Sequence, residues 1–335
     1  MTTTPLLISS YDAVLSDLDG VVYAGAGAVP EAVPALRGLH GHGVALAYIT
    51  NNASRSPEQV AEHLCGLGAP ATAGQVFGSA AAGSELLAGL IAPGAPVLVV
   101  GSGYLRSCVE SRGFRVVDSA ADAPAAVIQG FDPTLGWTDL AEAAYAIQRG
   151  AAWVATNTDL TIPRAEGIAP GNGSLVDAVA NATGAVPLVA GKPEPLLFER
   201  AARTLGADRP LVVGDRLDTD ILGGNRAGFA TASILTGIDG TAEILGAAAA
   251  ERPRYILGNL AGLYEPYPAL EHDAGAHRCG GASARVVDGT VTVAGVEDDL
   301  DAWRAACAAW WAATPEAASR TRPDLVFSGA SGGSR

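Results

Sequence analysis

Two aspartates separated by one residue carry the clearest chemical signal in the chain. Asp17 and Asp19 follow an apolar run and precede Gly20. On an extended backbone, residues two positions apart point to the same side, so both carboxylates can face one bound group, and the glycine permits a sharp turn. One carboxylate can accept a phosphoryl group while the second protonates the leaving alcohol and then activates water. The pair alone is equally compatible with a clamp for a metal ion and a sugar nucleotide, or with an ordinary surface loop.

The apolar run before Asp17 predicts a buried parallel strand, whose carboxyl end is where open α/β sheets bind ligands. Similar runs recur along the chain with helical stretches between them, which predicts a doubly wound parallel α/β sheet. The runs cover residues 44–50, 96–100, 125–129, 152–155, 186–190, 211–213, 230–236 and 254–257.

The second of these strands ends in residues suited to holding phosphate. Thr50, Asn51 and Asn52 offer a hydroxyl and amides at the strand end. A helix is predicted from Pro57, so Asn52, Ser54 and Ser56 before it are also suited to capping that helix. The two interpretations are compatible, because a helix amino end is itself an anion site.

Two later strands end in charged residues. Lys192 follows one of them, where a fixed ammonium can neutralise phosphate. Asp215, Asp218 and Asp220 follow another. Such a cluster is costly without a cation, and its hard oxygen ligands suit Mg²⁺. Before these two strands, a polar glycine-rich stretch around Asn157 is typical of a functional loop, although turns alone explain it.

Composition excludes several classes of partner. The 335 residues are 49% apolar and carry a formal net charge of −14, which argues against binding to nucleic acid or anionic membranes. The first ten residues lack the features of a signal peptide, and no apolar run is long enough to insert in a membrane. Four cysteines without a Cys-x-x-Cys pair fit a reducing cytoplasm. His272, His277 and Cys279 are poorly spaced for a metal site.

The last part of the sequence differs in pattern from the rest. Residues 284–293 predict a hairpin with a turn at Asp288-Gly289. An apolar stripe at helical spacing follows, which favours packing onto the body of the protein or onto a partner. The Ser/Gly-rich residues 328–335 predict disorder. The stripe comprises Leu300, Trp303, Cys307, Trp310 and Trp311.

Taken together, the strand ends resemble those of the haloacid dehalogenase superfamily, specifically its class IIA phosphatases, the NagD-like and p-nitrophenylphosphatase-like branch. The similarity covers residues 11 to about 262 and rests on the stretches DLDGVVY, ITNNASRS, AGKPEP and VGDRLDTDILGGNRAG. It implies a Rossmann-like core (1–78 and 188–265), an inserted α/β cap (79–187) and, beyond the family pattern, a small α+β appendage (266–335).

The resemblance also implies roles for individual residues. Asp17 is expected to be the nucleophile and Asp19 the general acid and base. Mg²⁺ is expected to be held by the Asp17 carboxylate, the Asp19 backbone carbonyl and Asp215, with Asp220 in support. The residues expected to bind the phosphoryl group or the substrate are Thr50, Asn51, Asn52, Asn157 and Lys192.

The resemblance further implies a Mg²⁺-dependent hydrolase of a small phosphate ester in the cytoplasm, and leaves a homo-oligomer open. The cap motifs and the extra carboxyl-terminal segment are most similar to bacterial glycerol-3-phosphate phosphatases of this branch, which would place the chain in glycerolipid metabolism. Relatives that act on pyridoxal phosphate have a histidine where this chain has Ile162. Phosphoglycolate, a nucleoside monophosphate or a broad set of small esters are alternative substrates. A phospho-aspartate signalling module is the alternative from another class, although such modules lack a large insertion between their Thr and Lys.

Overall fold

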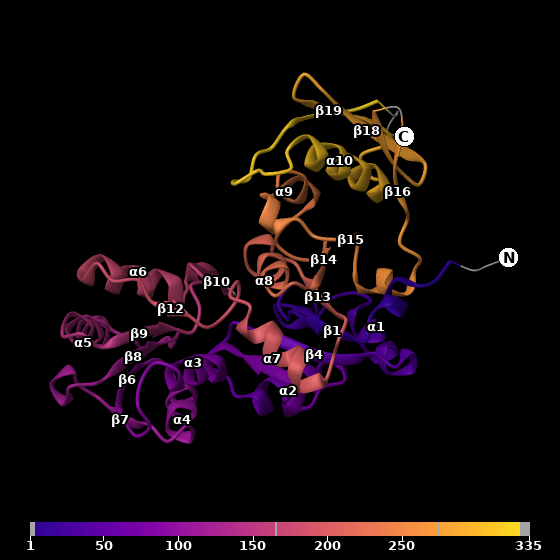
Figure 1. The fold of residues 1–335 in the computed structure, drawn as a ribbon. Coiled ribbons are helices and arrows are strands. Elements are labelled where there is room, and N and C mark those ends of the chain that lie inside the picture. Colours follow the sequence, from indigo (N-terminus) through magenta and orange to yellow (C-terminus); the bar gives the residue numbers. More distant parts are fainter. Residues whose placement is uncertain (1–3, 165, 274, 329–335) are drawn as a thin grey trace. The chain divides into compact units, whose positions relative to one another are not determined.

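The computed structural model describes residues 4–164, 166–273 and 275–328. The chain divides into two compact units (Figure 1). The first joins residues 1–45 to residues 207–335, and the second comprises residues 46–206. The first unit is therefore discontinuous in sequence.

A parallel sheet forms the centre of the first unit. Its strands lie in the order β15, β14, β13, β1, and neighbours run parallel. All residues of β1 and β13 are buried, as expected of strands covered on both faces. The strands are β1 (Ala13–Ser16), β13 (Pro210–Gly214), β14 (Ala230–Ile234) and β15 (Tyr255–Leu257), with helices α1 (Ala32–Gly38), α8 (Leu222–Arg226) and α9 (Thr241–Leu245) and the hairpin β2 (Tyr23–Ala24) and β3 (Gly27–Ala28).

The carboxyl-terminal part of this unit is a second sheet with one helix, α10 (Leu300–Ala313), against it (Figure 1). Asp288 and Gly289 have φ of 49° and 80°, the left-handed values that a tight two-residue hairpin turn requires, so the predicted hairpin is confirmed. The helix predicted from the apolar stripe is confirmed as well. The strands lie in the order β16 (Leu270–Asp273), β17 (Ala276–Cys279), β18 (Ala282–Val287), β19 (Thr290–Ala294) and β20 (Asp324–Phe327).

This appendage, β16 to β20 with α10, shares a hydrophobic core with the rest of the first unit. Leu217, Ile221 and Ile244 from the parallel-sheet part pack in one buried cluster with Trp303 and Cys307 of α10. Cys307 is 1% exposed and Trp303 is 8% exposed. The appendage is therefore packed as an integral part of the unit, in agreement with the predicted packing of the stripe onto the body.

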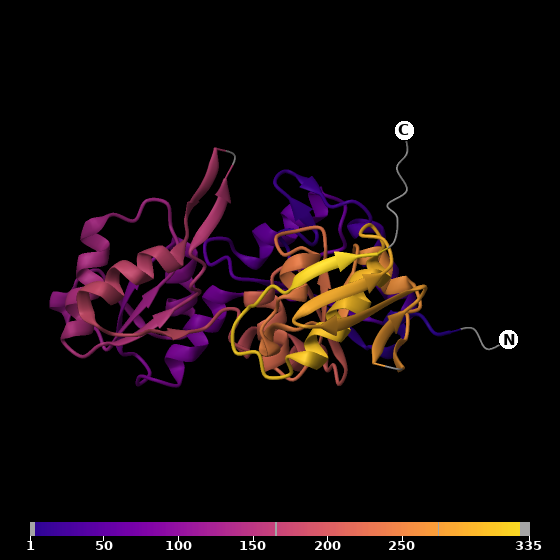
Figure 2. The same ribbon diagram turned by 90° about the horizontal axis from the view of Figure 1, so that it is seen from above.

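The second unit contains a five-stranded parallel sheet in the order β12, β9, β8, β6, β7. A hairpin, β10 and β11, extends from this unit (Figure 2). The strand pair β4 and β5 is also parallel. The strands are β4 (Ala45–Thr50), β5 (Val76–Gly78), β6 (Pro96–Val100), β7 (Arg115–Val117), β8 (Ala126–Gln129), β9 (Ala152–Ala155), β10 (Thr161–Arg164), β11 (Gly167–Pro170) and β12 (Leu188–Val189).

Helices cover both faces of that five-stranded sheet. Val97, Ile128 and Val154 pack with residues of α3 and α4, and alternate residues such as Val127 and Ala155 pack with residues of α5 and α6. This alternation is the period-2 pattern of a strand buried on both sides. The helices are α2 (Pro57–Gly66), α3 (Ser79–Ala88), α4 (Gly103–Ser111), α5 (Trp137–Gln148), α6 (Asn172–Thr183) and α7 (Leu196–Leu205).

The expected α/β fold class is confirmed, and one strand is shorter than expected. The run from Val186 forms only the two-residue strand β12, which lies at the sheet edge. Val186 lies before this strand and is 88% exposed, and Leu188 within the strand is 50% exposed. The three-part domain division stays a prediction, and the predicted disorder beyond Ser328 lies outside the described residues. In the described part of the chain, no helix has the length and apolar character to span a membrane.

Candidate active site

Three carboxylates gather at the ends of two neighbouring strands in the first unit. Asp17 follows β1 and Asp215 follows β13, its parallel neighbour, while Asp220 lies one turn further on. One oxygen from each carboxylate lies within 4.8 Å of the other two. Asp17 is 9% exposed, Asp215 2% and Asp220 1%. The structure thus brings Asp17 together with the acid-rich loop, as predicted.

Asp215 is held by the segment that follows β14. The backbone N–H of Ile238 donates to Oδ2 of Asp215 at 2.8 Å, and the N–H of Asp239 donates to the Asp215 carbonyl at 3.0 Å. A Cβ added to Gly20 or Gly237 would lie 2.3 or 1.9 Å from that Oδ2. Both positions must therefore be glycine for the carboxylate to stay in place.

Asp220 lies in a short π-helical turn, Leu217–Ile221. Its Oδ2 accepts a hydrogen bond from the N–H of Arg216 at 3.2 Å. Its Cβ would lie 2.1 Å from a Cβ on Gly214, so the glycine that ends β13 lets the turn close against the strand. Single π-type turns are often found at functional sites, and this one places a buried acid beside Asp17.

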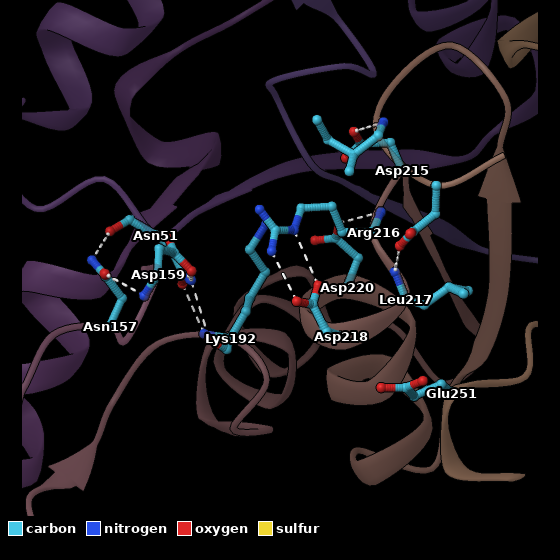
Figure 3. A network of polar contacts seen from close by, with 12 residues as sticks. Asn51, Asn157, Asp159, Lys192, Asp215, Arg216, Leu217, Asp218, Asp220 and Glu251 are labelled. Atoms are coloured by element: carbon cyan, nitrogen blue, oxygen red, sulfur yellow. Dashed lines mark hydrogen bonds and ion pairs between the residues drawn. The ribbon is translucent and has the colours of Figure 1, made fainter. Parts of the chain in front are cut away.

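The neighbouring acids of the loop point elsewhere. Asp218 forms a bidentate pair with Arg216, with N···O distances of 3.0 and 2.8 Å (Figure 3). Burial acts to raise the pKa of Asp218, but the hydrogen bond and charge of Arg216 outweigh it, so the pKa lies below its usual range. Asp239 accepts from the N–H of Leu217 at 2.7 Å. Burial raises the pKa of Asp239, although that hydrogen bond and the charge of Arg320 oppose the rise.

Asp19 lies in the turn that leads from β1 to the β2–β3 hairpin. Gly20 has φ of +76°, which confirms the predicted sharp turn, and the Thr236 hydroxyl donates to the Gly20 carbonyl at 2.7 Å. The Asp19 carboxylate is exposed and accepts a hydrogen bond from the Tyr23 hydroxyl at 3.4 Å. An exposed carboxyl beside a buried one suits proton exchange with solvent.

In the second unit, Asn51 and Lys192 are joined through the asparagine amide. Oδ1 of Asn51 accepts from the N–H of Lys192 at 2.8 Å, and Nδ2 donates to the Lys192 carbonyl at 3.1 Å (Figure 3). Nδ2 also lies 3.1 and 3.2 Å from the two carboxylate oxygens of Asp159. A Cβ on Gly191 would lie 2.5 Å from Oδ1, so the glycine permits this close approach.

Asn157 extends the same network. Its Nδ2 donates to the carbonyl of Asn51 at 2.7 Å, and its own carbonyl accepts from Nδ2 of Asn172 at 2.7 Å. The Ser79 hydroxyl donates to the Asn51 carbonyl at 2.6 Å. Asn51, Asn157 and Lys192 are all less than one tenth exposed. We call Asn51, Asn157, Asp159 and Lys192 the amide cluster.

Thr50 and Asn52 have local roles. The Thr50 hydroxyl accepts from the N–H of Asn52 at 3.1 Å. Oδ1 of Asn52 accepts from the N–H groups of Ser54 and Arg55 at 2.8 and 3.1 Å, which shapes the loop before α2. The cap of α2 itself is Ser56, so Asn52 organises the approach to the helix without capping it.

Two family models match the segments of the chain that contain the acid cluster, Asn51 and Lys192. Residues 14–115 match a family model described as haloacid dehalogenase-like hydrolase, and residues 189–263 match one described as HAD-hydrolase-like. The D-glycerol 3-phosphate phosphatase of Mycobacterium tuberculosis is 42% identical over 316 residues, which are 92% of this chain and 88% of that protein. The chain belongs to the haloacid dehalogenase-like hydrolases.

Two further comparisons agree with this membership. A crystal structure of a glycerol phosphate phosphatase from Mycobacterium tuberculosis in complex with magnesium superposes with a TM-score of 0.88 at 40% identity, covering 98% of this chain and 96% of that chain. The 5′-nucleotidase YutF of Bacillus subtilis is 37% identical over 233 residues, 69% of this chain and 90% of its own. The resemblance and the enzyme class expected from the sequence are confirmed.

The acid cluster of this haloacid dehalogenase-like hydrolase fits a hard divalent cation. Asp17, Asp215 and Asp220 supply oxygen ligands only, and like charges held this close are unfavourable without a cation. Among the described residues, no other group of three His, Cys, Asp or Glu side chains brings its ligand atoms within 4.8 Å of one another. His272 and His277 do face each other, with ring centroids 4.5 Å apart, while Cys279 is directed to Asp301.

Sequence reasoning missed the residues that support the site. Asp239 and Asp159 bind site residues through hydrogen bonds, yet neither was assigned a role. Asp239 lies in the loop five residues beyond the end of β14, whereas Asp215 directly follows β13, so the strand pattern alone does not single out Asp239. Asp159 lies in a polar loop whose partners come from a distant segment, and no local pattern reveals it.

Proposed function

We propose that this hydrolase is a Mg²⁺-dependent phosphatase that converts glycerol 3-phosphate to glycerol and inorganic phosphate. The observation that carries the chemistry is the buried cluster of Asp17, Asp215 and Asp220 at adjacent strand ends. The likeness to a D-glycerol 3-phosphate phosphatase over most of both chains supports the substrate.

In the proposed reaction, a carboxylate oxygen of Asp17 attacks phosphorus, and the bond from phosphorus to the glycerol oxygen breaks. Asp19 gives its proton to the departing oxygen. Asp19 then takes a proton from water as the water oxygen attacks the aspartyl-phosphate, which releases phosphate and restores Asp17. The exposed carboxyl of Asp19 and its position two residues from Asp17 support this division of roles.

The proposed metal ligands are the carboxylates of Asp17 and Asp215 and the backbone carbonyl of Asp19, with Asp220 in support. Bound there, Mg²⁺ would offset the repulsion between an anionic nucleophile and an anionic phosphate. Asp215 is held by two backbone N–H groups, and Asp220 is held by the N–H of Arg216, so both acids are oriented by the protein itself.

We further propose that the residues that bind the phosphoryl group or the substrate are Thr50, Asn51, Asn52, Asn157 and Lys192. The hydrogen bonds of Asn51 support a specific version of this assignment, in which the Asn51 amide fixes the backbone of Lys192. The ammonium of Lys192 then balances the charge of the phosphate. Asn157 in turn fixes the backbone of Asn51.

The remaining proposals concern the setting of the enzyme. We place it in the cytoplasm, with a phosphate ester and no nucleic acid as its partner, and leave a homo-oligomer open. We also keep the division into a core (1–78 and 188–265), a cap (79–187) and an appendage (266–335). The net charge of −14 supports the exclusion of nucleic acid.

The test is phosphate release from a panel of esters with Mg²⁺ and with a chelator. The panel is glycerol 3-phosphate, phosphoglycolate, pyridoxal phosphate, a nucleoside monophosphate and p-nitrophenyl phosphate. We expect Mg²⁺-dependent turnover and a kcat/KM for glycerol 3-phosphate at least ~10-fold above the others. A preference for the nucleoside monophosphate would reject the substrate and favour the 5′-nucleotidase alternative, which the similarity to YutF supports. A stable phospho-Asp17 without turnover would favour a signalling module.

A further inference from the structure

The segment after α10 returns to the parallel-sheet part of the first unit. We call residues 314–323 the strap. Its backbone is held by two hydrogen bonds of 2.8 Å, from the N–H of Ala249 to the Ala317 carbonyl and from the N–H of Thr321 to the Gly246 carbonyl. A Cβ on Gly246 would lie 3.1 Å from the Thr321 carbonyl oxygen, so the strap lies directly on this loop.

The strap carries Arg320 to two acids of the parallel-sheet part. Its Nε donates to Oε2 of Glu251 at 2.6 Å, and its terminal nitrogen lies 3.7 Å from Oδ1 of Asp239. The side chains of Glu251 and Asp239 are 15% and 8% exposed, whereas that of Arg320 is 38% exposed. The hydrogen bond that Arg320 donates to Glu251 is the largest of the effects that raise the pKa of Arg320.

Asp239 connects this ion pair to the acid cluster. Its Oδ2 accepts from the N–H of Leu217, the first residue of the π-helical turn that contains Asp220. Its own N–H donates to the carbonyl of Asp215. One residue therefore contacts the loop at Asp215 and again at the start of the turn, and its carboxylate is paired with Arg320 on the other oxygen.

We propose that Arg320 is a positioning residue for the metal-binding loop, acting through Asp239. The arginine fixes the orientation of the Asp239 carboxylate, which fixes the spacing of Asp215 and Asp220. The appendage is then a working part of the active site. This inference rests on the proposed function in one respect, because it takes Asp215 and Asp220 as the acids that hold the metal.

The strap also contains a matched control. Arg322 pairs with Glu243, and its side chain is 64% exposed. Both arginines belong to the same strap, but Arg320 is paired with Asp239 and Glu251, whereas Arg322 is paired with Glu243. Substitution of either arginine should weaken the docking of the strap. Only substitution of Arg320 should also weaken the binding of Mg²⁺.

The experiment measures Mg²⁺ binding to the full chain by isothermal titration calorimetry without substrate, beside the Mg²⁺ activation constant and the unfolding midpoint of the metal-free protein. We expect Arg320→Ala to weaken Mg²⁺ binding about 10-fold, and Arg322→Ala by less than about 2-fold. Arg320→Lys should retain most of the Mg²⁺ affinity that Arg320→Ala loses. In all of these arginine variants, kcat at saturating Mg²⁺ should stay near that of the unsubstituted protein. Adding Arg320→Ala to Asp239→Asn should cause little further loss, because the two act as one unit.

Three results would overturn the inference. The first is unchanged Mg²⁺ affinity in Arg320→Ala, and the second is an equal loss in both arginine variants with equal falls in unfolding midpoint. If Arg320→Ala does not fold, Glu251→Gln takes its place in the experiment. The third result is unchanged Mg²⁺ affinity in Glu251→Gln. A parent protein that binds Mg²⁺ but hydrolyses none of the panel would reject the proposed function while leaving the arginine comparison intact.

Discussion

The acid cluster of the first unit and the amide cluster of the second are built in opposite ways. Asp17, Asp215 and Asp220 bring like charges within 4.8 Å of one another. Asn51 instead joins Lys192 and Asp159 through donors and acceptors that match. Both depend on glycines that permit close approach, Gly20 and Gly237 in one and Gly191 in the other.

The contrast separates reactivity from positioning. The surrounding backbone holds these like charges close together, and their repulsion favours a bound cation and a reactive carboxylate. A satisfied network of buried amides stabilises one arrangement of distant segments and has no reactive group of its own except the lysine. Substitutions in the acid cluster should therefore lower activity with little loss of stability, whereas substitution of Asn51 in the amide cluster should also lower the free energy of unfolding.

The largest effect is expected from Asp17→Asn. The amide is a poor nucleophile, so kcat should fall by at least ~10³-fold. Because the change removes one like charge from the cluster, the unfolding midpoint of the metal-free protein should stay equal or rise. Asp218→Asn is the control, since Asp218 pairs with Arg216 outside the cluster. Substantial turnover in purified Asp17→Asn would contradict the assignment of the nucleophile.

Gly20→Ala sharpens the comparison by displacing one carboxylate without removing it. The new Cβ would meet Oδ2 of Asp215 at 2.3 Å. Gly25→Ala is the matched control, because Gly25 also has positive φ but nothing lies within 4 Å of an added Cβ. We expect roughly 10-fold weaker Mg²⁺ binding by calorimetry for Gly20→Ala alone. Equal losses in both variants would mean that backbone strain, and not the position of Asp215, sets the affinity.

Asn51→Ala tests the second unit. It leaves the buried N–H and carbonyl of Lys192 without the Asn51 amide, and we expect a loss of about 2 kcal/mol in the free energy of unfolding, measured with denaturant. Asn52→Ala is the control, because Asn52 is exposed and shapes only its own loop. Similar losses from both substitutions would show that the network around Asn51 contributes no special stability.

The smallest effect is expected from Gln129→Leu. Gln129 is fully buried at the end of β8, and neither of its amide atoms has a hydrogen-bond partner within the described ranges. Replacing an unsatisfied amide with an apolar group of similar size should raise the free energy of unfolding by about 1 kcal/mol. Asn157→Leu, which removes a satisfied amide, should lower it. If Gln129→Leu were clearly destabilising, the amide would have a bound water as its partner.

The sequence was most informative where chemistry is local. Asp17, Asp19 and Asp215 stand beside apolar runs and glycines, and the Asp288-Gly289 turn sits between two strand patterns, so adjacent residues revealed each. Asp239, Asp159 and Arg320 are different, because their partners lie in other segments and no periodicity encodes those pairings.

The strap has a consequence for how the enzyme is made. Strands β1 and β13 to β15 precede the strap in the chain, so they leave the ribosome before Arg320 does. If Arg320 orients the loop, a nascent chain can form its parallel sheet well before it reaches full affinity for metal. The same holds for a product of proteolysis within the strap. Translation order would then delay full affinity for Mg²⁺ until the chain has been read through α10 and the strap.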